Sequence, residues 1–147
     1  MELVEDARPL YQCVWRFRDT HRFPEAIARH FAAQLVVAIG VLHELRYVHR
    51  DLKSGNVLVD QRGNAKIIDY GFAMRLGDDE KQHEPQEEQN MTAASICGTH
   101  YIVAPEMSLG LSYGFEIDWW YVSRVVDSTA GIGGDFIGIG WDAGRSV

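Results

Sequence analysis

At 147 residues, the chain is long enough for one compact domain with a substantial hydrophobic core. Hydrophobic residues make up 46% of the sequence and charged residues 24%, as in an ordinary globular protein, which excludes a disordered or fibrous chain. The formal net charge of −7 disfavours a nucleic-acid backbone or an anionic membrane surface, so we expect neither as a partner.

Cysteine content and hydropathy indicate the compartment. Cys13 and Cys97 are too few and too isolated for a disulfide framework, and no basic and apolar leader precedes them. The longest nearly uncharged stretch, from Phe31 to Leu42, is too short to span a bilayer. We therefore expect a reducing location, cytoplasmic or nuclear.

The first predicted element is a helix from Phe23 to about Glu44, with Pro24 in its first turn. Its apolar residues recur at steps of three or four, as one face of a helix requires. These residues are Ile27, Phe31, Leu35, Ala38, Leu42 and Leu45.

Further along the chain, residues 57–60 and 65–68 are strand-like and flank a turn over 61–64 that contains Gly63, which predicts a β-hairpin. Residues 78–88 hold six acids and predict a solvated loop. Between 131 and 144, six of fourteen residues are glycine, and 124–147 shows no helical pattern, so we expect this tail to be poorly ordered.

A polar motif, His-Arg-Asp-Leu-Lys-Ser-Gly-Asn, runs from His49 to Asn56, directly before the hairpin. Thirteen residues after Asn56, directly after the hairpin, comes Asp69 in an Asp-Tyr-Gly sequence. Because a hairpin brings its two ends together, Asn56 and Asp69 should lie side by side. Their oxygen atoms would suit a hard cation such as Mg²⁺.

Three shorter motifs follow: Cys-Gly-Thr at 97–99, Ala-Pro-Glu at 104–106 and Asp-Trp-Trp at 118–120. In this order and spacing, the motifs resemble those of the eukaryotic serine/threonine protein kinases, from residue 1 to about 122. The resemblance implies an incomplete protein-kinase-like α+β fold: a mainly α-helical large lobe with a short β-hairpin at the active site. Residues 1–123 would form a partial kinase domain, and 124–147 the divergent tail.

The resemblance assigns catalytic roles to Asp51, Lys53 and Thr99. Asp51 would position the hydroxyl of the substrate, Lys53 would place its charge against the transferring phosphate, and Thr99 would form hydrogen bonds near this pair. Lys53, two residues after Asp51, points to the serine/threonine branch rather than the tyrosine branch. The implied reaction transfers the γ-phosphate of ATP to a Ser or Thr hydroxyl of a protein substrate.

The implied cofactors are ATP and Mg²⁺. Asn56 and Asp69 would hold the metal ion and, together with Lys53, the phosphates. The backbone of Glu2 and Val4 would meet the adenine edge at a hinge, and Leu58 would form the apolar floor below it, although Leu58 fits an ordinary core position of the hairpin equally well.

The sequence also departs from the family pattern. The glycine-rich loop, the strand Lys and its helix Glu partner are absent from the 147 residues, and Ser123 stands where the family usually has Gly. We therefore expect the chain alone to be inactive. The motifs favour the group of cyclic-nucleotide-dependent kinases and their relatives, known as the AGC group.

Two regulatory residues follow from the resemblance. Ser95, two residues before Cys97, is the expected phosphorylation site, and Arg50 would receive its phosphate. Arg8 and Gly55 stand where basophilic relatives carry acidic side chains, so we expect no demand for arginine upstream of the target residue.

Three interpretations of the chain are open. It could be an enzyme, a non-catalytic binding or scaffold module derived from a kinase, or a truncated gene fragment. A metal cluster of His43, His49, Cys97 and His100 is a fourth interpretation of the same residues, but its ligand spacing matches no known site.

Overall fold

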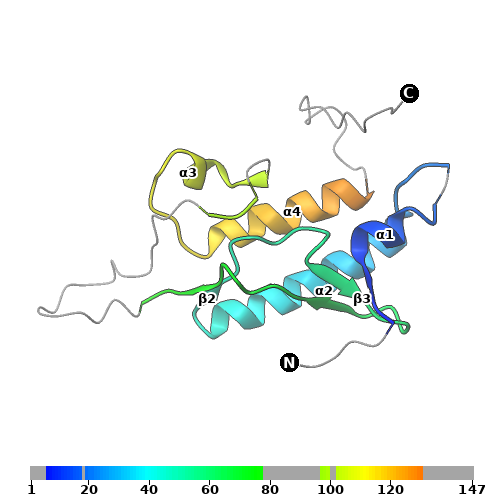
Figure 1. Ribbon diagram of the computed structural model, residues 1–147, viewed down its shortest axis with the longest axis horizontal. Helices are drawn as coiled ribbons and strands as arrows, with labels where there is room; N and C mark the ends of the chain where they lie inside the picture. The colour runs from blue at the N-terminus through cyan, green and yellow to red at the C-terminus, as the bar shows by residue number, and fades with distance from the viewer. Residues whose placement is uncertain (1–5, 18, 78–96, 100–101, 131–147) are drawn as a thin grey trace, which may run out of the picture.

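The computed structural model describes residues 6–17, 19–77, 97–99 and 102–130. In chain order the elements are β1 (Arg8–Pro9), α1 (Leu10–Val14), α2 (Glu25–Glu44), β2 (Tyr47–Val48), β3 (Val57–Val59), β4 (Ala65–Ile67), β5 (Met74–Arg75), α3 (Pro105–Ser108) and α4 (Glu116–Ala130). Figure 1 shows the two long helices, α2 and α4, beside each other, with the short strands grouped near α2. The fold is α+β and mainly helical, as expected.

Helix α2 confirms the predicted helix, and Pro24 is its N-cap residue. Four of its residues, Ala28, Phe31, Leu35 and Ile39, are buried and contact the core. Leu45, expected on this face, is the C-cap residue and is 61% exposed, because the helix ends before it can turn inward.

By length and composition, α2 could also cross a membrane, which the shorter uncharged stretch noted in the sequence did not indicate. Its apolar residues also serve the core, since α2 packs against α4. The backbone N–H of Phe23 donates to the carbonyl of Thr129 at 2.7 Å and joins the start of α2 to the end of α4.

The predicted hairpin is formed by β3 and β4, which pair antiparallel with Val57 opposite Ile67. The Asp60 carboxylate accepts hydrogen bonds from the N–H groups of Arg62 and Asn64 and closes the turn. Strand β1 adds to the free side of β3. Strands β2 and β5 form a second antiparallel pair, and this pair connects the polar motif to the segment after Asp69.

Helix α4 continues past Ser123 to Ala130, so the expectation that residues after Ser123 show no helical pattern is wrong for 124–130. Val122, Val125 and Thr129 follow the helical period and are buried, which provides a packing face beyond Ser123. The hydroxyl of Thr129 donates to the carbonyl of Val125, so its polar group is satisfied within the helix. The rest of the expected tail, 131–147, lies outside the described residues.

Candidate active site

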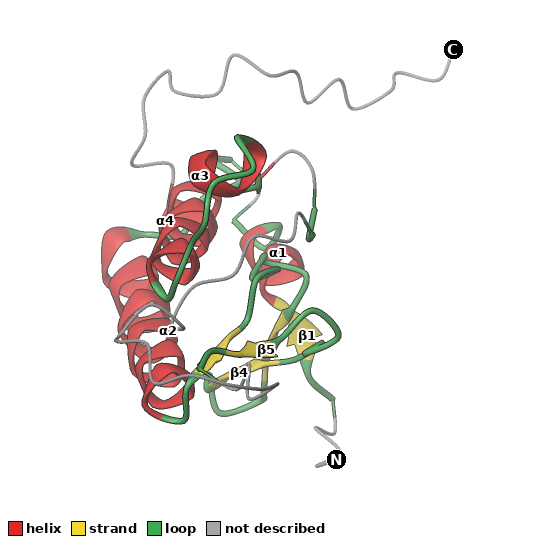
Figure 2. Ribbon diagram, turned by 90° about the vertical axis from the view of Figure 1, so that its left-hand side faces the viewer, coloured by secondary structure: helices red, strands yellow, loops and turns green. Residues whose placement is uncertain are grey.

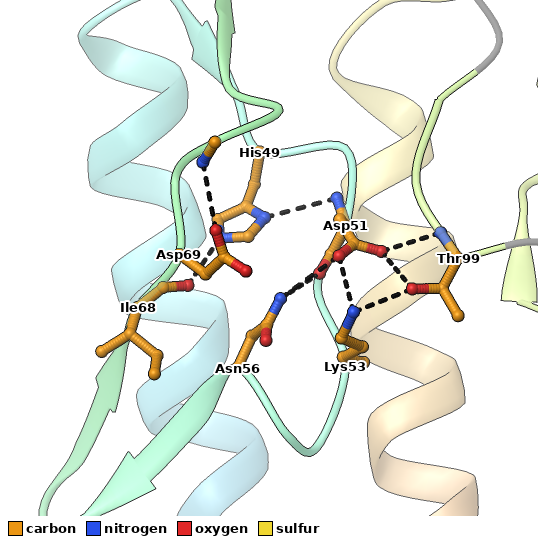
Figure 3. A network of polar contacts seen from close by, with 8 residues as sticks. His49, Asp51, Lys53, Asn56, Ile68, Asp69 and Thr99 are labelled. Carbon is orange, nitrogen blue, oxygen red and sulfur yellow. Dashed lines mark hydrogen bonds and ion pairs between the residues drawn. The ribbon is translucent and has the colours of Figure 1, made fainter.

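The Asp51 carboxylate is the centre of the polar network shown in Figure 3, and Asp51 is only 2% exposed. Lys53 Nζ donates to Asp51 Oδ2 at 2.8 Å. The backbone N–H and the hydroxyl of Thr99 donate to Asp51 Oδ1 at 2.9 and 2.7 Å. Lys53 Nζ also donates to Thr99 Oγ1 at 2.9 Å, so the three predicted catalytic residues form one connected cluster.

Burial alone would raise the pKa of Asp51, but the hydrogen bonds from Lys53 and Thr99 outweigh it and hold the pKa below its usual value. Asp51 is therefore an ionised hydrogen-bond acceptor at neutral pH. The adjacent Lys53 ammonium is partly exposed, so it can reach both Asp51 and an anionic group arriving from solvent.

The neutral imidazole of His49 holds the loop that carries Asp51 through two hydrogen bonds. Its Nε2 donates to the Ile68 carbonyl at 3.3 Å, and its Nδ1 accepts from the backbone N–H of Asp51 at 3.4 Å. This assignment of the ring proton satisfies both contacts, and burial lowers the pKa of His49, which favours the same neutral form. His49 is thus a buried scaffold residue beneath the loop that carries Asp51.

Asp118, fully buried at the start of α4, anchors the loop from the other side. Its carboxylate accepts hydrogen bonds from the backbone N–H groups of His49 at 2.8 Å and Arg50 at 3.0 Å. His43 Nε2 lies 2.9 Å from the same carboxylate. One side chain of α4 therefore links the end of α2 to the backbone that carries Asp51.

Arg50 has a left-handed backbone, with φ of 68°, and its side chain reaches two other segments. Its Nε donates to the Phe72 carbonyl at 2.6 Å and its Nη1 to the Tyr113 hydroxyl at 3.2 Å. Arg50 thus joins the loop to the segment after Asp69 and to the loop before α4. Ser95, its expected phosphorylated partner, lies outside the described residues.

Asn56 and Asp69 lie at the two ends of the hairpin, as predicted. The N–H of Ile68 donates to the Asn56 carbonyl at 2.9 Å, which holds these ends together. Figure 3 shows both side chains extending from adjacent strand ends toward the Asp51 network.

The donor set at this position fits a hard divalent cation. Asn56 Nδ2 donates to the Asp51 carbonyl at 2.9 Å, which orients the amide and leaves its Oδ1 without a donor in the described part of the chain. Asp69 is exposed and receives one long contact, from the Gly71 N–H at 3.4 Å. An amide oxygen and an open carboxylate are ligands that Mg²⁺ accepts.

The alternative metal cluster is not supported. Over the described residues, no group of three or more His, Cys, Asp or Glu side chains could hold a metal ion. His43 and His49 use their rings in the contacts given above, and His100 is not described.

Gly98 permits the close approach of Thr99 to Asp51. Its φ is +89°, and a Cβ atom added there would lie 2.7 Å from the Arg50 carbonyl oxygen and 3.4 Å from Asp51 Oδ1. The same atom would lie 3.3 Å from the hydroxyl of Tyr121, a buried residue of α4 whose pKa is raised mainly by burial. Only glycine fits this position without displacing its neighbours.

The remaining predicted nucleotide contacts are less complete. Leu58, in the middle of β3 opposite Lys66 and Pro9, is half-buried, which is compatible with either expected role. Glu2 and Val4 lie outside the described residues.

Sequence reasoning missed the positioning roles of His43 and Asp118. His43 was considered only as a metal ligand, and Asp118 only as part of a motif. The signal for Asp118 was available, because a carboxylate directly before two tryptophans needs hydrogen-bond donors if the segment packs in a core.

Comparison with known proteins agrees with this geometry. The family model described as protein kinase domain matches residues 1–127. The ribosomal protein S6 kinase-related protein of Homo sapiens is 41% identical over 108 residues, which cover 74% of this chain and 24% of the human protein.

Two further relatives are about equally similar. The atypical protein kinase C of Drosophila melanogaster is 37% identical over 110 residues, covering 73% of this chain and 16% of the relative. The cAMP-dependent protein kinase catalytic subunit of Schizosaccharomyces pombe is 37% identical over 109 residues, which cover 74% of this chain and 19% of the relative. The chain thus spans a quarter or less of the length of these relatives. With its motifs, its site and these matches, the chain belongs to the protein kinase domain family, in the AGC group of serine/threonine kinases.

Proposed function

We propose that this chain carries the catalytic and metal-binding part of a serine/threonine protein kinase, which transfers the γ-phosphate of ATP to a Ser or Thr hydroxyl of a protein. The observation that supports this most directly is the cluster of Asp51, Lys53 and Thr99, with three contacts of 2.7–2.9 Å to one buried carboxylate.

In the proposed reaction, the acceptor hydroxyl donates a hydrogen bond to the Asp51 carboxylate, which aligns its oxygen with the γ-phosphorus. The bond from that oxygen to phosphorus forms while the bond to the bridging oxygen of ADP breaks, and the hydroxyl proton goes to Asp51. Because the pKa of Asp51 is low, the residue contributes mainly through position rather than base strength.

Lys53 would stabilise the charge on the transferring phosphoryl group. It is already held 2.8 Å from Asp51 and 2.9 Å from Thr99, so little reorganisation is needed when the substrate binds. Preorganised charges of this kind commonly contribute about 10²–10³ in rate.

Asn56 and Asp69 would hold Mg²⁺ in this site. When bound there, Mg²⁺ would supply positive charge to offset the negative charge of the phosphates. The contact from Asn56 to the Asp51 carbonyl couples the orientation of the metal ligand to the position of the catalytic carboxylate.

The setting is part of the same proposal. Cys13 and Cys97 are both free, which is compatible with a reducing cytoplasmic or nuclear location. The net charge of −7 supports a protein substrate rather than a nucleic acid or an anionic membrane.

The test compares Asp51→Asn and Asp69→Asn with the matched control Asp127→Asn, a carboxylate of α4 that pairs with Arg124. Transfer from radiolabelled ATP is measured with the 147-residue chain and with the longest transcript product of the same gene. Mn²⁺-induced broadening of NMR signals measures metal binding in the 147-residue chain.

In the longer product, Asp51→Asn should lower the transfer rate by about 10²-fold or more, and Asp127→Asn should leave it unchanged. Asp69→Asn should reduce the Mn²⁺ broadening near Asn56, whereas the control should not. Because the glycine-rich loop and strand Lys are not among the 147 residues, this chain alone should show no transfer above that of its Asp51→Ala variant. The proposal would be refuted if phosphate transfer persisted in Asp51→Asn, or if Asp69→Asn left the Mn²⁺ broadening near Asn56 unchanged.

A further inference from the structure

The face of α2 that points away from the core carries a regular row of residues. This row, which we call the outer row, consists of His30, Ala33, Val37, Gly40 and Glu44. The spacing alternates between three and four residues, which keeps all five on one side of the helix. Val37 is 66% exposed and the adjacent Val41 is 52% exposed, so the middle of the row is an apolar surface. Figure 2 shows α2 at the outer edge of the described molecule, with α4 on its inner side.

Gly40 is the least expected member of the outer row. Glycine inside a helix is unfavourable compared with alanine, and the helical backbone here needs no glycine. A Cβ atom added to Gly40 would meet nothing within 4 Å, so no neighbour in the described residues requires its absence. Because Gly40 has no side chain and Ala33 has only a methyl group, another backbone can approach this side of α2 closely.

A hollow lies beside the row and can accept side chains from a second helix. Its volume is about 430 Å³, and it extends along α2 as far as the start of β4. The residues that line it are His30, Ala33, Gln34, Val37, Ala38 and Ala65. A valine from an opposing helix would find apolar contacts there.

The charges on α2 are arranged so that the face complements itself. His30 and Glu44 lie seven residues before and after Val37, and Arg29, which pairs with Glu25 of the same helix at 3.1 Å, adjoins His30. Glu44 makes no hydrogen bond or ion pair within the described ranges. In an antiparallel pair centred on Val37, Glu44 of one copy would lie against Arg29 and His30 of the other, whereas a parallel pair would place Glu44 against Glu44.

From this row, hollow and charge pattern, we propose that the outer face of α2 is an antiparallel, two-fold symmetric interface between two copies of this chain. Val37 packs on the partner's Val37, Gly40 and Ala33 allow close approach, and Glu44 faces His30 and Arg29 of the partner helix. The contact spans fifteen residues of helix, about 21 Å from His30 to Glu44, so the dimer is weak and depends on concentration.

The first experiment is sedimentation velocity on the 147-residue chain over a range of concentrations. The expected result is a reversible monomer–dimer equilibrium. Val37→Asp places a charge on the two-fold axis, where it meets its own copy, and should raise the dissociation constant by about tenfold or more. The matched control is Leu109→Asp, because Leu109 is 73% exposed but lies after α3, and it should leave the equilibrium unchanged.

Gly40→Gln separates loss of the interface from loss of the fold. Glutamine is a better helix former than glycine and meets open space within one copy, so the thermal midpoint should rise. The same side chain blocks the approach of the second helix, so the dimer should weaken. A variant with a higher thermal midpoint and an unchanged dimer would overturn the proposal.

Charge reversal tests the orientation. Glu44→Lys should weaken the dimer, while Asp19→Lys, the same change in charge at an exposed position before α2, should not. Equal effects of the two variants would overturn the antiparallel arrangement. The interface itself is refuted by a chain that stays monomeric at all concentrations, that forms only undefined aggregates, or that instead co-sediments with phosphatidylcholine and phosphatidylserine vesicles through α2.

Discussion

Replacement of Gly98 by alanine should disrupt the active site and lower the stability of the fold. The backbone at Gly98 has φ of +89°, where an L-residue is strained, and the new Cβ would lie 2.7 Å from the Arg50 carbonyl oxygen. That oxygen belongs to the backbone and cannot move without shifting Asp51. The substitution therefore combines backbone strain with a steric overlap next to Asp51, the proposed catalytic residue.

Gly63 provides a matched control for the size of this effect. Its φ is +83°, close to that of Gly98, but an added Cβ would meet nothing within 4 Å. Gly63→Ala should therefore cost only the strain, about 1–2 kcal/mol. Gly98→Ala should cost a further 1–3 kcal/mol or so for the overlap. At about 2–4 °C per kcal/mol for a chain of this size, the thermal midpoint of Gly98→Ala should lie roughly 2–12 °C below that of Gly63→Ala.

Circular dichroism on thermal unfolding measures this difference, and NMR shifts of the Thr99 amide report whether its contact with Asp51 is lost. Gly63→Ala should leave that amide shift in place because the turn is remote from it. Equal midpoints for the two variants, or an unchanged Thr99 amide in Gly98→Ala, would show that the tight approach at Gly98 is not required.

Three further predictions concern pH, phosphorylation and specificity. Burial lowers the pKa of His49, so on acidification His49 of the unfolded chain becomes protonated before His49 of the folded chain. The urea midpoint of unfolding should therefore fall as the pH drops below about 6.5, and His49→Gln should remove this loss of stability. The pKa of Asp51, which burial would raise, is lowered overall by its hydrogen bonds, so a second loss of stability should follow below about pH 4. A urea midpoint that does not change with pH in the acid range would contradict the His49 and Asp51 predictions. Phosphopeptide mapping of the cellular protein should find phosphate on Ser95, and a map without it would show that assignment to be wrong. A peptide array should show no selection for arginine two or three residues before the target, because Arg8 and Gly55 offer no acidic contact, and strong arginine selection would refute this reasoning.

The sequence alone was sufficient for the features that depend on short separations along the chain. The apolar period identified α2, and turn chemistry identified the β3–β4 hairpin. Since a hairpin joins its own ends, the spacing of thirteen positions from Asn56 to Asp69 was enough to place these two candidate ligands at neighbouring strand ends. Local geometry has few solutions over such distances, so pattern and spacing determine it.

The tertiary structure decided what depends on contacts between distant segments. Strand β1 and the β2–β5 pair are each two residues long and form only because a partner strand is present, so no periodicity could reveal them. The part of α4 beyond Ser123 has few strong helix formers, and it is helical because Val125 and Thr129 pack in the core.

The support of the active site is the clearest case of this division. The motif identified Asp51, but its position depends on Asp118, a residue 67 positions later whose carboxylate holds the backbone of the loop. His43 reaches the same carboxylate from the end of α2, across 75 residues of sequence. The sequence was enough to name the candidate catalytic residues, whereas the packing of α4 against α2 decided how they are held, because burying the Asp118 charge requires donors that only the folded chain brings together.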